Sequence, residues 1–323
     1  MRIKGMVVLA MMVSLVLSLG GCSAGEKAYP NKPIEFVVPS SAGGSGDAFI
    51  RTVADILTKE KLINVPTTVV NKPGGSGAIA FKYSAEKIGD PYVIQSTPST
   101  FIVAPILSKD CPNYTQFTPI AMLATEPQCI IVKADSPYQT LESLVEGSKS
   151  KSGGLTWSFS SVGSYDHLMA LQFARMTGAK VVLVPQPSDN ESIVAVLGGH
   201  ADVASMSMRS ALGQVEAGKV KMIGVACLER AKKVPDVPTL KELGYDIVMG
   251  IPRAVCAPKD IPENARDVLI DAFKKLAATE RWQKYVDDEC LVPEEHYGDD
   301  YTNFLKVETE KVEPLLRDAG LVQ

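Results

Sequence analysis

The chain has 323 residues, of which 46% are hydrophobic and 22% are charged, a composition typical of a globular protein. Its 33 basic and 37 acidic residues give a formal net charge of −4. This balance, without any basic block, argues against a nucleic-acid partner and against a polybasic membrane-binding surface.

The first 21 residues are predicted to be a secretory signal peptide. Two basic residues precede an apolar run from Met6 to Leu19, which is shorter than the roughly 20 residues of a membrane span. The sequence Leu19-Gly20-Gly21-Cys22 resembles a bacterial lipobox, so we expect cleavage before Cys22 and a lipid on its thiol. An ordinary signal peptide is the alternative. Residues 22–28 would form a lipidated tether outside the cytoplasm, in the periplasm or on the outer face of the cytoplasmic membrane.

Five further cysteines follow, an odd number, so at least one has no partner within the chain. No CxxC pair or Cys/His ligand spacing occurs, so neither a zinc site nor another cofactor is predicted. Disulfides are possible outside the cytoplasm but cannot be paired from the sequence. These cysteines are Cys111, Cys129, Cys227, Cys256 and Cys290.

A strand, a glycine loop and a helix are predicted at the start of the mature chain. The β-branched run from Ile34 ends at Pro39, and apolar residues then recur at helical spacing from Ile50 to Leu57. Small residues let the backbone approach a ligand, and the helix start offers unpaired N–H groups to an anion. The candidate ligand-binding residues here are Ser40, Ser41, Ala42, Gly43, Gly44, Ser45 and Asp47. Asp47 either contacts the ligand or pairs with Arg51 at i,i+4.

A second strand-loop-helix unit follows, and after it a strand that opens into a small polar loop. Thr67–Val70 and Tyr92–Gln95 are predicted strands, and Ala78–Lys87 is a predicted helix. Strands that alternate with helices predict a mostly parallel α/β sheet whose ligands bind at the carboxyl ends of the strands, which adds Thr97 to the candidates. Neither glycine loop matches a nucleotide-binding fingerprint.

The segment around Thr125–Pro127 is predicted to cross into a second domain, because apolar runs lie on both sides of it. Glu146–Gly154 is polar and is predicted to be a linker. The strand Leu155–Phe159 then opens into another loop of small residues before a buried helix at Leu168–Met176.

This second loop gives the candidates Ser160, Ser161, Val162, Gly163, Ser164 and His167. Ser164 can offer both its hydroxyl and its N–H to one anion. His167 either donates to a carboxylate or bonds to nearby backbone.

The remaining chain predicts further strands and helices. Met206, Met208, Trp157 and Trp282 are interpreted as core residues. The expected elements are strands at Lys180–Val184, Asp202–Met206 and Met222–Ala226, a helix at Ser188–Leu197, a return between domains near Ile247–Ala257, a helix at Ala265–Leu276, and a helix at Tyr301–Ala319 interrupted around Pro314.

From Tyr29 to Val322 the chain resembles the solute receptors of tripartite tricarboxylate transporters, also called Bug proteins. The resemblance is carried by motifs in order: Tyr29-Pro30-Asn31-Lys32-Pro33-Ile34; Pro39 with Gly43-Gly44, Asp47 and Arg51; Asn71-Lys72-Pro73-Gly74 with Gly77; Phe117-Thr118-Pro119-Ile120; Ser160 with Gly163-Ser164 and His167-Leu168; Gly198-Gly199-His200 with Asp202; and Arg230 with Pro235-Asp236-Val237-Pro238-Thr239 and Glu242.

The resemblance implies an α/β periplasmic-binding-protein fold, type II-like, with two lobes of mixed sheets joined by two crossover strands. Residues 29–126 plus 251–323 would form lobe 1, and residues 127–250 lobe 2. A small carboxylate (a di- or tricarboxylate, an aromatic acid or an acidic amino acid) would bind between the two loops and pass to membrane permease subunits, without catalysis. Ser40, Ser161 and Gln186 border this expected pocket and depart from the usual family residues.

Two other functions remain open at this stage. A ligand-sensing subunit that docks on a membrane signalling receptor would differ only in its docking surface. A hydrolase with Ser164 and His167 as nucleophile and base is the weaker alternative, because no GxSxG motif is present and the chain has only three histidines.

Overall fold

The computed structural model describes residues 28–322, so the predicted signal peptide and Cys22 lie outside the described residues. The strands form one sheet in the order β2-β1-β3-β9-β4-β7-β5-β6, and β10 and β8 both pair with β4. The strands are β1 (Ile34–Val38), β2 (Thr67–Asn71), β3 (Val93–Ser96), β4 (Phe117–Lys133), β5 (Leu155–Phe159), β6 (Val181–Pro185), β7 (Val203–Ser207), β8 (Val220–Val225), β9 (Gly250–Pro258) and β10 (Val292–Tyr297).

Helices pack on both faces of this sheet. They are α2 (Ser45–Lys59), α3 (Ala78–Ala85), α4 (Thr100–Leu107), α5 (Leu141–Ser150), α6 (Tyr165–Thr177), α7 (Asp189–Leu197), α8 (Met208–Glu216), α9 (Glu263–Ala277), α10 (Glu280–Asp288) and α11 (Asp299–Asp318), with short 3₁₀ turns at Gly75–Gly77 and Tyr114–Gln116.

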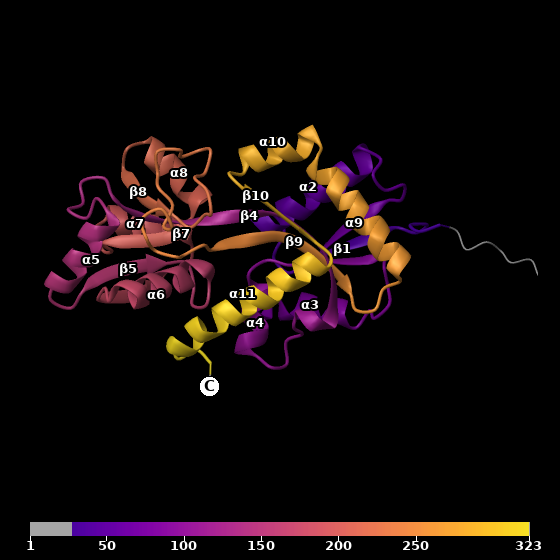
Figure 1. Cartoon of the computed structure of the whole chain (residues 1–323), viewed down its shortest axis with the longest axis horizontal. Coiled ribbons are helices and arrows are strands. Elements are labelled where there is room, and N and C mark those ends of the chain that lie inside the picture. Colours follow the sequence, from indigo (N-terminus) through magenta and orange to yellow (C-terminus); the bar gives the residue numbers. More distant parts are fainter. Residues whose placement is uncertain (1–27, 323) are drawn as a thin grey trace, which may run out of the picture.

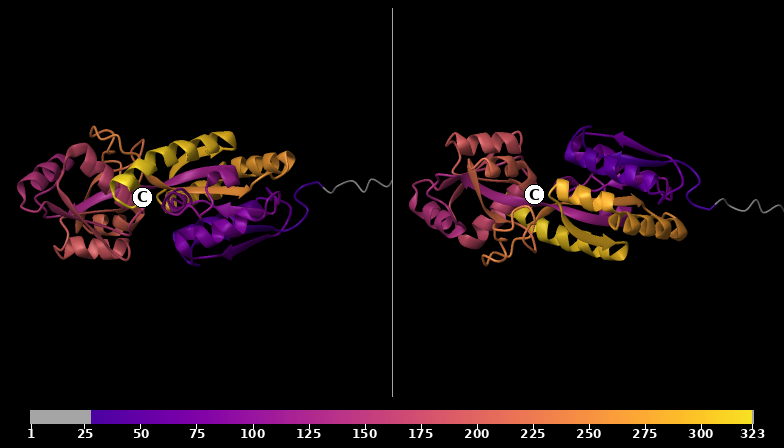
Figure 2. Two further views of the ribbon diagram at one scale, coloured as in Figure 1. Left: turned by 90° about the horizontal axis from the view of Figure 1, so that it is seen from below. Right: turned by 90° about the horizontal axis from the view of Figure 1, so that it is seen from above.

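The molecule has two lobes (Figure 1). The first lobe contains β1–β3, β10 and the helices α2–α4, α9 and α10, and the second contains β5–β8 and α5–α8. Figure 2 shows the lobes at opposite ends of the long axis, with the crossing strands between them. β4 is continuous through both lobes: up to Pro127 it pairs with β9, and from Gln128 onward it pairs with β7.

The strand directions make the carboxyl ends of the parallel strands in one lobe face those in the other lobe. β1, β2 and β3 are parallel, β3 is antiparallel to β9, and β9 is antiparallel to β4. The first three strands therefore run toward the second lobe. β7 is antiparallel to β4, and β5 and β6 run with it, so these strands run toward the first lobe. The loops after both sets of strands end at the junction between the lobes.

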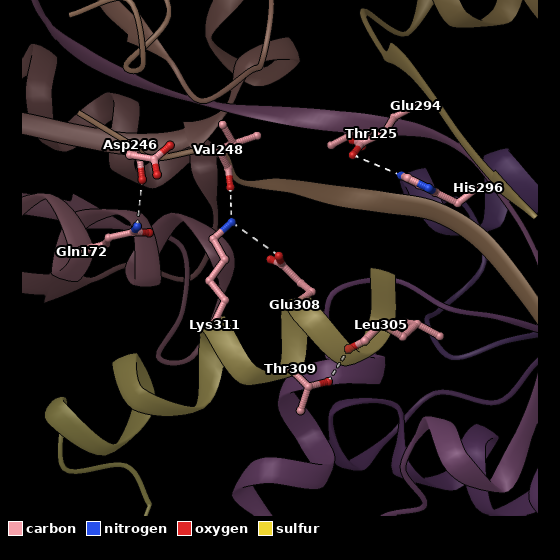
Figure 3. Close-up of polar contacts among 10 residues, drawn as sticks. All are labelled: Thr125, Gln172, Asp246, Val248, Glu294, His296, Leu305, Glu308, Thr309 and Lys311. Atoms are coloured by element: carbon pink, nitrogen blue, oxygen red, sulfur yellow. Dashed lines mark hydrogen bonds and ion pairs between the residues drawn. The ribbon is translucent and has the colours of Figure 1, made fainter. Parts of the chain in front are cut away.

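Helix α11 provides a further, non-covalent link between the lobes. It begins next to β10 and packs against both α4 and α6. Its Lys311 Nζ donates to the carbonyl of Val248 at 2.6 Å, just before β9 (Figure 3). Nearer its end, Asp318 pairs with Arg175 of α6 at 2.5 Å. The position of this helix therefore depends on the position of both lobes.

Several predicted boundaries were wrong. Glu146 to Ser150 belong to helix α5, not to a linker, because Thr140 caps the helix and Leu144 anchors it in the core. Helix α11 is not interrupted at Pro314, because the buried residues Val312 and Leu315 hold the turn on each side. Helices α4, α8 and α10 and strand β10 were not predicted from the sequence. Met206, Met208, Trp157 and Trp282 are buried, as predicted.

Candidate functional site: two loops at the junction of the lobes

The first loop is anchored by Asp47, in the first turn of α2. This side chain accepts hydrogen bonds from the Gly43 N–H, from Arg51 Nε and from Asn71 Nδ2, each at 2.9 Å. Asn71 Nδ2 also donates to the Ser40 carbonyl at 3.0 Å. The predicted pairing of Asp47 with Arg51 is thus confirmed. The network fixes the loop at Ser40 and at Gly43 and leaves residues 41–45 exposed.

The ionised form of Asp47 should stabilise the fold in a pH-dependent way. The hydrogen bond from Arg51, helped by those from Gly43 and Asn71, lowers the pKa of Asp47 to about 2, against about 3.9 in an unfolded chain. Because the folded-state pKa is the lower one, this stabilisation is complete above about pH 5 and disappears as the pH falls toward about 2. We expect Asp47→Asn to unfold at lower urea concentration than wild type near pH 7, with a difference that shrinks on acidification. An unchanged difference at about pH 2.5 would contradict this account.

The second loop is held by two side chains of α6. Asp166 accepts from the Ser160 N–H at 2.5 Å, and His167 Nδ1 accepts from the Gly163 N–H at 3.1 Å. Since Nδ1 is an acceptor, the ring proton of His167 lies on Nε2. Burial lowers the pKa of His167, so the ring is neutral near pH 7 and stacks on Phe159. The backbone-bonding interpretation of His167 is confirmed, and Nε2–H remains as a second donor.

The helix starts behind both loops have no capping side chain. Gly44 is the N-cap residue of α2 and Ser164 is the N-cap residue of α6, and neither makes a side-chain cap hydrogen bond. Both donors of Ser164 instead reach the Ser161 carbonyl, the hydroxyl at 2.5 Å and the N–H at 3.2 Å. To bind an anion as predicted, Ser164 has to break its hydrogen bonds to the Ser161 carbonyl and donate to the ligand instead. The uncapped amides, with the positive end of the helix dipole, favour an anion.

The second loop lies against the first lobe. A Cβ added at Gly163 would be 3.5 Å from Leu107 Cδ1 and 3.6 Å from Val103 Cγ1, both on α4. Val162 is exposed beside it. Two other candidate residues already make hydrogen bonds within the protein. The Thr97 hydroxyl contacts the Tyr301 hydroxyl at 2.8 Å, and the Gln186 N–H donates to the Phe159 carbonyl. The side chain of Gln186 is half-buried at the same edge.

A polar cluster that was not predicted from the sequence lies where β4 crosses between the lobes. Glu126 on β4 forms a buried ion pair with Arg253 of β9 and accepts from the Ser207 hydroxyl at the end of β7. Asp189, the first residue of α7, accepts from the Ser207 N–H at 3.3 Å. The charged Glu126 inside an apolar segment was the only sign of this cluster in the sequence, but its partners Ser207 and Arg253 are more than 80 residues away along the chain.

The described residues contain no cluster of three or more His, Cys, Asp or Glu side chains placed to hold a metal ion. All five cysteines from Cys111 to Cys290 are buried free thiols. No helix between residues 28 and 322 is long and apolar enough to cross a membrane.

Residues 49–321 match the family model described as tripartite tricarboxylate transporter family receptor. The chain belongs to this family. One relative is the "UPF0065 protein in gbd 5′ region" of Cupriavidus necator, 28% identical over 297 residues, which cover 91% of this chain and 90% of the relative. The resemblance seen in the sequence is therefore confirmed.

Solved structures agree with the family assignment. A TctC solute binding protein from Polaromonas, determined without ligand, has a TM-score of 0.82 and 27% identity, covering 90% of this chain and all of the other. MatC from Rhodopseudomonas palustris, determined with bound malate, has a TM-score of 0.70 and 21% identity over 89% of this chain and all of MatC; at that identity it shows the fold alone. The predicted two-lobe periplasmic-binding fold is confirmed, and the family implies an extracytoplasmic location.

Proposed function

We propose that this receptor holds a small carboxylate between the glycine loop of its first lobe and the Ser/Gly loop of its second lobe. The observation that carries the proposal is the opposed placement of the two loops at strand ends that face each other, with uncapped helix starts behind both. The family assignment, and a related structure that holds malate, support a carboxylate as the ligand. The proposed contacts are residues 40–45 with Asp47 and Thr97 in one lobe, and residues 160–164 with His167 and Gln186 in the other.

Backbone amides are sufficient for such a ligand. A hydrogen bond to a charged group contributes roughly 1.5–3 kcal/mol, and micromolar binding needs about −8 kcal/mol. Three or four donors at each end of a diacid reach this value after ordering costs, so no arginine is required in either loop. Closure of the lobes lets both loops contact the ligand at once, which shifts the open–closed equilibrium.

The boundaries proposed for the lobes are 29–126 with 251–323 for lobe 1 and 127–250 for lobe 2. We further propose that the receptor is anchored by a lipid on Cys22, passes its ligand to the membrane permease subunits of a tripartite transporter, and catalyses no reaction. The geometry of Ser164 and His167 supports the absence of catalysis, because the Ser164 hydroxyl donates to the Ser161 carbonyl and not to the imidazole.

A thermal-shift screen of mono-, di- and tricarboxylates, aromatic acids and acidic amino acids tests the proposal. A ligand present at 100 times its Kd should stabilise the fold by about 2.7 kcal/mol, which raises the melting temperature measurably. The diamide of each active acid is the control and should produce no shift, because it lacks the charge that the amides recognise. If no carboxylate raises the melting temperature, or if the diamides act equally well, the carboxylate proposal is wrong.

A further inference from the structure

Asn71, the last residue of β2, connects the second glycine loop to the first. It lies beside Val38 in the pairing of β2 with β1, so its side chain reaches the point where the chain leaves β1. Its Nδ2 donates to the Ser40 carbonyl at 3.0 Å and to Asp47 Oδ1 at 2.9 Å, and its Oδ1 accepts from the Arg51 guanidinium at 3.2 Å. All three partners belong to the first loop or to helix α2 behind it.

These three partners require a short side-chain amide. Two of them are oxygen acceptors and the third is a guanidinium donor, so one side chain has to supply two N–H donors and one oxygen acceptor. An aspartate here would lack both donors and would place a second carboxylate next to Asp47. The hydrogen bonds, and not the volume of the side chain, therefore account for the asparagine.

The hydrogen bond from Asn71 also sets the direction of the peptide between Ser40 and Ser41. In a trans peptide the carbonyl and the N–H point to opposite sides, and the only cis peptide among residues 28–322 is Tyr29–Pro30. Because the Ser40 carbonyl is held against Asn71, the Ser41 N–H points away from β2. Ser41 is exposed, and its N–H has no hydrogen-bond partner within the described part of the chain. This amide is therefore free for a ligand.

Other amides of the two loops are already used. The Gly43 N–H donates to Asp47, and the N–H groups of Ser160 and Gly163 donate to side chains of α6. Fewer amides are thus available to an anion than the loops contain, so the direction of each remaining amide matters for affinity.

We propose that Asn71 is a positioning residue of the ligand site, which directs the Ser41 N–H toward the anion by holding the Ser40 carbonyl. This inference rests on the proposed carboxylate-binding function. It adds a residue of the second glycine loop, which the proposed contacts do not include. Without the bond from Asn71 the peptide between Ser40 and Ser41 can rotate, and the anion loses one charge-assisted hydrogen bond.

Asn71→Ala should weaken ligand binding about tenfold or more, which corresponds to one lost hydrogen bond to a charged group. Titration calorimetry measures the change with malate, succinate or glutarate, whichever raises the melting temperature of the wild type most. If none of the three acids binds to the wild type, this inference falls, and the rest of the thermal screen decides separately whether the receptor proposal survives.

Asn113→Ala is the matched control. Asn113 accepts from the Thr115 N–H at 2.9 Å and caps a 3₁₀ turn before β4, at the end of that strand away from the second lobe. This variant should lose stability and keep wild-type affinity. Wild-type affinity in Asn71→Ala, or an equal loss of affinity in both variants, would overturn the inference and leave the carboxylate receptor standing.

An exchange of two side chains separates the network around Asp47 from the bond to Ser40. In the double variant Asp47→Asn/Asn71→Asp, the amide at position 47 can donate to the carboxylate at position 71, and the Gly43 N–H and Arg51 keep their acceptor. The Ser40 carbonyl, however, faces a carboxylate and has no donor. This variant should therefore resist urea better than Asn71→Asp alone, but should still bind the acid tenfold or more weakly than wild type.

Two results of the exchange would overturn the inference. Recovery of wild-type affinity would show that the bond to the Ser40 carbonyl does not matter for the ligand. A double variant no more stable than Asn71→Asp would show that the hydrogen bonds of Asn71 are assigned wrongly.

Discussion

Replacement of Arg253 by methionine is expected to lower the free energy of unfolding by about 3–5 kcal/mol, because it leaves the Glu126 carboxylate buried without its cation. The side chains of Arg253 and Glu126 are only 4% and 8% exposed. They join β9 to β4 within three residues of the point where β4 changes its partner from β9 to β7. Urea unfolding followed by circular dichroism measures the loss.

The double variant Glu126→Gln/Arg253→Met separates the charge effect from the loss of packing. It should recover most of the stability, since the ion pair is replaced by two neutral side chains and no charge stays buried. Lys284→Met is the surface control: its pair with Asp288 has side chains 75% and 56% exposed, so the expected change is below about 1 kcal/mol. A double variant as unstable as Arg253→Met would show that an unpaired charge is not the cause.

Gly43→Val is expected to weaken ligand binding about 100-fold. Gly43 has φ = +85°, a conformation that a β-branched residue adopts only with strain of about 1–3 kcal/mol. The loop relieves this strain by moving, which misdirects the neighbouring amides. Loss of two hydrogen bonds to a charged ligand, at roughly 1.5–3 kcal/mol each, accounts for the expected change in affinity. Calorimetry with the acid that gives the largest thermal shift measures it.

Gly153→Val is the matched control for Gly43→Val. Gly153 has φ = +82°, and a Cβ at either glycine would meet nothing within 4 Å, so the backbone strain is alike. Gly153 precedes β5, at the opposite edge from the second loop. Both variants should lose similar stability, but only Gly43→Val should lose affinity. If the two variants bind the ligand with equal affinity, the first loop is not part of the binding site.

Much of the local structure could be predicted because its causes are local. The β-branched run before Pro39 and the helical spacing after Gly44 both act over a few residues, and β1 and α2 formed as expected. Asp47 and Arg51 are one helical turn apart, so their pairing was visible as well. By contrast, α10 was missed because its sequence is strongly polar apart from Trp282 and Val286, and only the packing of these two residues against the first lobe reveals the helix.

The sequence by itself determined the two loops, because glycines, small hydroxyl residues and the following helix starts are readable in order along the chain. Only the tertiary structure decided which polar residues lie at the junction between these loops. Glu126 meets Arg253 across 127 positions of sequence, and Asp189 meets the end of β7 only after β4 has carried the chain into the second lobe. Such contacts depend on strand order and direction, and no short-range pattern records them.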